Sequence, residues 1–339
     1  MAVPGLRQVN FVSPARPRIR HGAASLIAVG VLALLILLPA ARDASAAPIR
    51  CNGHAALCDR RYDQVVFAAT HNSFAAASQG FDVPSQPNGV ARQLRAGVRM
   101  FLLDTHHWET PADVQRAEER MPPARRAAFE SRLHEPAQPP AGIFLCHMYC
   151  GLGATPLPDT LAIFRQFMDR RPHEVVSIFL EDYVSAAETS AAFAAAGLTS
   201  YVYTHHDGAA WPTLGQMIGS GHRLVVFAEH HGGPPDWYRY GWNDVQDTRY
   251  DVLRADQFTC ALNRGTAGAN LFLLNHWIAK ATPSADDADQ VNRYPFLLAR
   301  ARQCHAERGR LPNFVAVNFY DRGDLFAVVD TLNGFVRGR

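Results

Sequence analysis

Short apolar runs recur along the chain, and polar segments with helical spacing separate them. The runs are rich in Val, Ile, Leu and Phe and hardly alternate, which is typical of strands buried on both faces of a parallel sheet. We predict seven clear strands, at Val65–Thr70, Met100–Asp104, Ile143–His147, Val175–Glu181, Leu224–Glu229, Leu271–Asn275 and Phe314–Phe319. An eighth strand must be weak, and we place it near Tyr201–Tyr203 or in the C-terminal tail.

The segments between these runs have the spacing of amphipathic helices. Alternation of strand and helix over the whole chain indicates a single α/β domain, either a TIM-like (β/α) barrel, irregular if one strand is weak, or an open sheet. A long charged, Pro-rich connection, Glu109–Pro140, predicts a helical excursion with a loop. We expect helices at Val90–Ala96, Asp159–Arg170, Ser185–Ala196, Asp286–Arg308 and Leu325–Phe335.

Every predicted strand ends in a side chain that can do chemistry. Barrel enzymes build their active sites at this end of the strands, whereas an open sheet concentrates such residues near one switch point. Their spread over seven successive runs favours the barrel. The residues are His71 with Asn72, Asp104, His147, Glu181 with Asp182, Glu229 with His230, Asn275 with His276, and Asn318.

Two histidines, His71 and His147, follow two of the buried runs. Imidazole titrates near neutral pH, so a pair can act as base and acid in one phosphoryl transfer. Asn72, Asp104 and Glu181 offer one amide and two carboxylates, which are hard oxygen ligands suited to Ca²⁺ or Mg²⁺. Any one of these residues alone is more often structural, but their joint position at strand ends favours a site.

The segment His230–Tyr250 is rich in aromatic residues. Trp237, Tyr238 and Trp242 are candidate substrate contacts, because an aromatic loop at a barrel mouth could grip an apolar or sugar-like substrate or touch a membrane interface. The alternative is that these rings pack on the barrel rim.

The N-terminus has the order of a secretory signal peptide: basic, apolar, then small residues. Three arginines between positions 16 and 20 precede an uncharged stretch, Gly22–Ala41, and then Ala44-Ser45-Ala46. We predict cleavage after Ala46, residues 47–339 as the barrel, and a secreted, periplasmic or extracellular protein. An uncleaved membrane anchor is the alternative, because the stretch is long enough to span a bilayer.

All six cysteines follow this leader, and an even count after a secretion signal indicates disulfides. The sequence does not fix their pairing; we predict the local pairs Cys51–Cys58, Cys146–Cys150 and Cys260–Cys304. Residues are 48% hydrophobic and 19% charged, which excludes a disordered chain or a coiled coil. The net charge of +2 gives no reason to expect a nucleic-acid partner.

Four sequence blocks in order resemble the X domain of phosphatidylinositol-specific phospholipase C: Ala69–Phe74, Gly97–Asp104, Leu145–His147 and Ser177–Asp182. The resemblance covers Tyr62–Asp182 well and the later strands loosely. It implies a TIM-like barrel in which the inositol 2-hydroxyl attacks phosphorus, expels diacylglycerol and leaves a cyclic inositol phosphate. His71 matches the base of that family and His147 the acid that protonates the leaving oxygen.

The family divides over how the phosphate is neutralised. Calcium-dependent members use an Asn after the first His, acidic residues in the second block and a Glu ending the fourth, and Asn72, Asp104 and Glu181 match that pattern. Many secreted bacterial members instead place an arginine at the position of Asp104. The resemblance thus implies Ca²⁺, with Mg²⁺ as the alternative, although Leu102 replaces an expected acidic ligand. Arg99 belongs to the second block and is either a substrate contact or structural.

Phosphoinositide-cleaving eukaryotic members carry basic residues near the fifth strand end, where this chain has Glu229-His230-His231. We therefore expect phosphatidylinositol, a glycosyl-inositol lipid or another phosphodiester as substrate, with peripheral membrane contact and a monomeric enzyme. One alternative is a glycerophosphodiester or sphingomyelin phosphodiesterase, but those usually show Glu-x-Asp where this chain has Leu102-Leu103-Asp104. Another is a non-catalytic binding protein, which Leu102 favours and the two retained histidines oppose.

Overall fold

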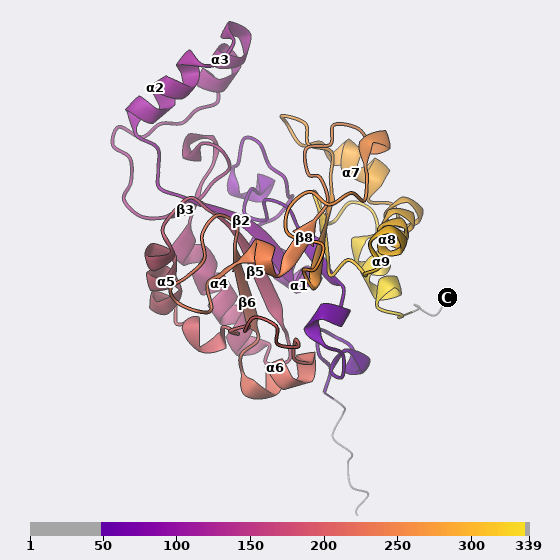
Figure 1. The fold of residues 1–339 in the computed structure, drawn as a ribbon. Coiled ribbons are helices and arrows are strands. Elements are labelled where there is room, and N and C mark those ends of the chain that lie inside the picture. Colours follow the sequence, from indigo (N-terminus) through magenta and orange to yellow (C-terminus); the bar gives the residue numbers. More distant parts are fainter. Residues whose placement is uncertain (1–48, 336–339) are drawn as a thin grey trace, which may run out of the picture. The chain divides into compact units, whose positions relative to one another are not determined.

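The computed structural model describes residues 49–335, which form one compact unit built around a parallel sheet. Eight parallel strands lie in the order β7-β6-β5-β2-β1-β10-β9-β8 and curl into a barrel with helices outside (Figure 1). The predicted signal peptide and cleavage site lie outside the described residues. The strands are β1 (Phe67–Thr70), β2 (Met100–His106), β5 (Val176–Asp182), β6 (Leu224–Ala228), β7 (Arg239–Tyr240), β8 (Val245–Asp247), β9 (Leu271–His276) and β10 (Phe314–Val317).

Burial on both faces explains why the strands hardly alternate in sequence. In β5, Ile178 and Leu180 pack in an outer core against helices, whereas Phe179 packs in an inner core inside the barrel. The same division holds in β6, where Val226 faces outward and Phe227 inward. Because side chains alternate between the faces of a strand, every second residue points into the barrel.

Helices cover the outer face of the curled sheet. In Figure 1, α4 and α5 lie at one side of the barrel and α8 and α9 at the other. The predicted helix over 286–308 is in fact two, because the chain turns at Asn292 and Arg293 and a new helix starts with Pro295 in its first turn, where proline is favoured. The helices are α1 (Val90–Ala96), α4 (Leu157–Arg170), α5 (Ala186–Ala195), α6 (Leu214–Ser220), α7 (Ala285–Val291), α8 (Tyr294–Arg308) and α9 (Leu325–Leu332).

The charged connection after β2 forms the two short helices α2 (Pro111–Glu119) and α3 (Pro123–Glu130), as the sequence predicts. They project away from the barrel (Figure 1). Thr110 caps α2 through a reciprocal hydrogen-bond pair with Asp113, and Pro111 occupies the first turn. The side chain of Arg126 donates to the carbonyl of Glu118 at 2.7 Å, which ties α3 to the end of α2.

Two strand predictions are wrong. The run ending in His147 gives only β3 (Phe144–Leu145), which pairs antiparallel with the end of β2 and with β4 (Thr155–Pro156), so it is not a barrel strand. Tyr201–Tyr203 gives a 3-10 turn and an isolated bridge at Val202. The missing barrel strands are instead β7 and β8, inside the aromatic segment. They are the two ends of the strand order, and within residues 49–335 no ladder joins them, so the barrel stays open at this seam.

The three predicted disulfides are all formed. Cys51–Cys58 lies at the amino end of the barrel, where Asn52 hydrogen-bonds to Val175 just before β5. Cys146–Cys150 closes a small loop that carries His147. The chain's first and last parallel strands, β1 and β10, are neighbours, with Phe67 opposite Phe314. The side chain of Asn333 strengthens this closure, because it bonds both backbone groups of Val66.

Candidate active site

Six polar residues take the inward-facing position where strands leave the inner core. Each stands two residues after an inward position, for example His71 after Ala69 and Glu181 after Phe179, so they form one polar layer above the apolar interior. The layer consists of His71, Asp104, Glu181, Glu229, Asn275 and Asn318. His71, Asp104, Glu181 and Glu229 line one cavity of about 80 Å³, together with Asn72.

His71 is held in a fixed orientation. Its Nδ1 lies 2.9 Å from the Oδ1 of Asn318, and its ring stacks on Trp277 with centroids 3.9 Å apart. Since the amide oxygen accepts, Nδ1 carries the proton and Nε2 keeps its lone pair. Burial lowers the pKa of His71 to about 3, although the hydrogen bond to Asn318 opposes the shift. The imidazole is therefore neutral near pH 7, the form that a base requires.

His147 has the opposite environment. Its Nδ1 donates to the Oδ2 of Asp104 at 2.9 Å, and it sits on the loop closed by the Cys146–Cys150 disulfide. Burial lowers the pKa of His147, but the hydrogen bond and negative charge of Asp104 raise it more, so its pKa lies above the ordinary histidine value. This imidazole retains its proton to higher pH, the form that an acid requires.

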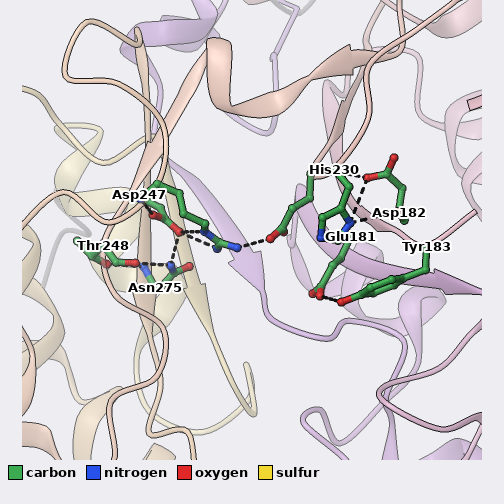
Figure 2. A network of polar contacts seen from close by, with 9 residues as sticks. Glu181, Asp182, Tyr183, His230, Asp247, Thr248 and Asn275 are labelled. Atoms are coloured by element: carbon green, nitrogen blue, oxygen red, sulfur yellow. Dashed lines mark hydrogen bonds and ion pairs between the residues drawn. The ribbon is translucent and has the colours of Figure 1, made fainter.

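Asp104 and Glu181 stand side by side, because they are register partners on neighbouring strands β2 and β5. Asn72 lines the same cavity, with its backbone in the left-handed region at φ 43°. Burial raises the pKa of the Asp104 carboxyl to about 6; the bond from His147 opposes this, and the charge of Glu181 adds to it. Among the described residues, Asp104 makes one side-chain hydrogen bond, with His147. Glu181 makes one with Tyr183, which Figure 2 shows.

These three side chains fit a hard divalent cation. Among the ion pairs of residues 49–335, Asp104 has His147 as its partner and Glu181 has none, so the pair of carboxylates lacks an Arg or Lys counter-charge. Amide and carboxylate oxygens are the ligands that Ca²⁺ and Mg²⁺ prefer. The expected fourth ligand is absent for a visible reason: Leu102 lies opposite Phe179 in the β2–β5 register, and both line the apolar floor of the cavity.

One tighter group of potential ligands exists in the described part of the chain, and it is not a metal site. Glu109, Cys146 and Cys150 bring their ligand atoms within 4.8 Å of one another. The two sulfur atoms form a disulfide, so neither is available as a thiolate. The Glu109 carboxylate instead accepts a hydrogen bond from the backbone N–H of Cys150 at 3.0 Å, which helps to hold the loop of His147.

Arg264, which no sequence pattern indicated, forms the cavity wall opposite Asp104 and Glu181. It forms ion pairs with Glu229 and with Asp247, the latter at 2.7 Å. Its guanidinium lies between the rings of Trp242 and Tyr250, 4.2 and 4.3 Å from their centroids. Figure 2 shows Asp247 with Asn275 and Thr248 on one side and Glu181 with Tyr183 on the other.

The ion pair with Arg264 sets the electrostatic environment of Glu229. Burial raises the pKa of the Glu229 carboxyl to about 8, and the charge of Arg264 opposes that shift. Glu229, which stands where other members carry basic residues, thus has a cationic partner of its own. Arg264 lies in the irregular segment between β8 and β9, where no strand pattern or motif singles it out.

None of the four predicted substrate contacts lines the cavity. Arg99 precedes β2 at the other end of the barrel, where it pairs with Glu174 at 2.8 Å. Trp237 and Tyr238 are buried in the outer core, and Trp237 packs on Phe193 of α5. These rings pack on the rim because α5 offers an apolar face. The fourth, Trp242, reaches the site through Arg264, and Trp277 and Tyr250 supply the aromatic lining instead.

Comparisons with known proteins identify the family and the fold of the chain. The model of the family described as PI-PLC X matches residues 133–333. An "Uncharacterized secreted protein" of Arthroderma benhamiae is 28% identical over 313 residues, which is 84% of this chain and 64% of that protein. A PI-PLC X domain-containing protein of Arabidopsis thaliana is 25% identical over 300 residues, which is 80% of this chain and 62% of that protein. The chain therefore spans somewhat less than two thirds of the length of these relatives.

A solved structure of the phosphatidylinositol-specific phospholipase C of Staphylococcus aureus shares the fold. It superposes with a TM-score of 0.51 at 12% sequence identity and covers 83% of this chain and 95% of that chain. The barrel with helices on its outside is thus common to both. The family match also reaches through the later strands, which the sequence blocks covered only loosely.

Proposed function

The chain belongs to the PI-PLC X family, and from this premise we propose that it is a phosphodiesterase of the phospholipase C type that cleaves an inositol phospholipid. One observation carries the proposal. Two imidazoles with opposite pKa shifts lie at one end of the barrel: burial lowers the pKa of His71 to about 3, and Asp104 raises the pKa of His147 above the ordinary histidine value. A base and an acid in these states are what a phosphoryl transfer between two oxygens needs.

The proposed first step transfers phosphorus from one oxygen to another. His71 accepts the proton of the inositol 2-hydroxyl on Nε2 as that oxygen bonds to phosphorus. The bond between phosphorus and the glycerol oxygen breaks, and His147 donates its proton to that oxygen. The products are diacylglycerol and a cyclic inositol phosphate. Asn318 keeps His71 in the required tautomer and Asp104 keeps His147 charged, so neither histidine has to reorganise during the step.

Asn72, Asp104 and Glu181 are the residues that would hold Ca²⁺, with Mg²⁺ as the alternative. A bound divalent cation would neutralise charge on the phosphate oxygens. The two carboxylates and the amide form one side of the cavity and repel a phosphate on their own, so the proposal expects the cation to improve binding of the anionic substrate.

Glu229 and Arg264 line the cavity and present an acceptor and donors suited to the hydroxyls of a polyol, and the buried Asp247 holds Arg264 in place. Arg264 is already paired with both carboxylates, so this wall has little spare positive charge for a ring phosphate. We therefore favour unphosphorylated phosphatidylinositol or a glycosyl-inositol lipid over a polyphosphoinositide. Since hydrogen-bonding sites reject analogues that leave buried polar groups unpaired, Arg264 and Glu229 also favour a ring with free hydroxyls.

We further propose that the protein is secreted. The sequence order of the leader, the three disulfides and the printed name of the Arthroderma relative support this. Within residues 49–335, no helix has both the length and the apolar character needed to cross a bilayer.

The test is cleavage of phosphatidylinositol by purified protein, with added Ca²⁺ or with a chelator, following cyclic inositol phosphate. We expect product that falls on chelation and disappears in His71→Gln. Product that survives chelation would remove the cation from the mechanism and keep the histidines. No product from phosphatidylinositol or glycosyl-inositol lipid would contradict the proposed activity.

A second candidate function is a barrel that binds inositol lipids without cleaving them. The apolar Leu102–Phe179 floor of the cavity favours it.

A further inference from the structure

A large apolar cleft adjoins the catalytic cavity. It has a volume of about 580 Å³, within the range of roughly 300–1,000 Å³ typical of ligand pockets. His71, Asn72, Tyr250 and Trp277 line both spaces, so the cleft opens directly onto the reacting centre. His147 lines the cleft and not the polar cavity.

The projecting helix α3 supplies one wall of this cleft. Arg125, Ala128 and Phe129 lie on one face of α3, at spacings of three and four, and Met121 before the helix and Arg132 after it extend this wall. Phe129 packs edge-on against Tyr149 with ring centroids 4.9 Å apart, which fixes α3 against the loop that carries His147. The segment after β9, residues 277–283, forms the opposite wall.

The chemistry of the two walls identifies the occupant. The polar cavity, with His71 and Arg264, suits the attacking polyol, so the group that departs lies on the side of His147. That side is lined mainly by apolar side chains. Of its charged groups, Lys280 pairs with Asp287 at 2.7 Å and Asp251 pairs with Arg249 at 2.8 Å. Arg125 and Arg132 add two further cations, a balance that favours an anionic amphiphile.

We propose that this cleft is a subsite for one alkyl or acyl chain of the leaving alcohol, so that the enzyme withdraws that chain from water or from a bilayer before cleavage. The inference rests on the proposed function, because it uses His147 as the acid for the leaving group. The proposal gives α3 a role in substrate selection. The helix encloses one side of the barrel mouth, where it would contact the apolar part of the substrate.

The experiment uses substrates that dissolve as monomers. We would measure kcat/KM for butyl, hexyl and octyl esters of inositol 1-phosphate below their micelle concentrations, and separately measure binding of butyl, hexyl and octyl phosphate by calorimetry. Burial of each methylene group should raise kcat/KM and affinity roughly fourfold until the cleft is filled. The binding series does not depend on turnover, so it tests the subsite even if no ester is cleaved.

A matched pair of variants on α3 locates the effect. Ala128→Trp fills the cleft, whereas Ala127→Trp places the same ring at the next, exposed position outside the cleft. We expect Ala128→Trp to abolish the chain-length dependence and Ala127→Trp to retain it. Ala281→Trp, in the opposite wall, should reproduce the effect of Ala128→Trp.

The outcomes separate the two proposals. Equal values for butyl and octyl compounds in both assays would overturn the subsite, whether or not the esters are cleaved. Chain-dependent binding without cleavage of any ester would support the subsite and contradict the proposed activity. If Ala128→Trp affects only hydrolysis in phosphatidylinositol vesicles and leaves the monomer series unchanged, the face is a membrane-docking surface and the chain subsite is wrong.

Discussion

The two histidines of the site differ in what holds them. His71 follows a fully buried barrel strand, and an amide from the neighbouring strand end fixes its tautomer. His147 stands on a loop outside the barrel order, where a disulfide closes the loop and a carboxylate holds the proton. Burial lowers the pKa of His71, whereas the hydrogen bond and charge of Asp104 raise the pKa of His147. Residue type alone therefore does not assign a base or an acid; the surroundings of each ring do.

The largest expected effect separates these roles directly. His71→Gln and His147→Gln should each lower kcat/KM on phosphatidylinositol about 10²- to 10⁴-fold, the usual contribution of one acid or base. With a p-nitrophenyl ester of inositol 1-phosphate, whose leaving group needs no proton, His147→Gln should recover most of the lost rate and His71→Gln should not. Equal losses on both substrates would break the assignment.

The next prediction tests whether the Cys146–Cys150 disulfide is needed to position His147. Cys146→Ser with Cys150→Ser should lower kcat up to about 10²-fold, because small misplacements of a catalytic group are costly. The matched control is Cys51→Ser with Cys58→Ser, which removes a disulfide at the other end of the barrel. Thermal unfolding should show destabilisation in both, whereas steady-state kinetics should show the large kcat loss only in the first. A similar kcat in the two double variants would sink the idea.

A smaller effect concerns the pH profile. Since the pKa of His71 is lowered to about 3, His71 stays neutral well below the ordinary histidine value of about 6.5, and kcat/KM should not fall as pH drops through that value on account of this group. Asn318→Asp places a carboxylate beside Nδ1, favours the imidazolium and should move the acid limb to higher pH. An acid limb that does not move in this variant would count against His71 as the base.

The smallest effect on activity is expected at Arg99. Arg99→Met removes one partner of a largely buried ion pair with Glu174 and should destabilise the protein by about 3–5 kcal/mol in denaturant unfolding. Below the unfolding temperature, kcat/KM should stay within about twofold, because Arg99 lies at the opposite end of β2 from the site. A large change in KM with unchanged stability would restore it as a substrate contact.

The barrel and much of its polar layer follow from the sequence for one reason: parallel strands buried on both faces give apolar runs, and the first polar residue after each run falls at the same end of the sheet. This reasoning places Asp104 and Glu181 correctly relative to each other. It also gives Asn318 at a strand end, without showing that its amide meets His71.

Other features depend on tertiary packing that no local pattern encodes. Arg264 comes from an irregular segment, Glu229 follows β6 and Asp247 ends β8, so the pairing appears only once the sheet has curled. The short strands β7 and β8 have too few residues to show a period. The sequence places Trp237 and Tyr238 in a loop as candidate substrate contacts, but they are buried against the apolar face of α5.

The neighbouring position of β1 and β10 has a consequence for the order in which the protein can be made. The hydrogen bond from His71 to Asn318 spans 247 residues, and the clamp of Asn333 on Val66 spans 267. During synthesis the first strand therefore gains its second neighbour only after Asn318, 247 residues beyond His71, has left the ribosome, and such long-range pairing is slow. Until then His71 lacks the amide that sets its tautomer.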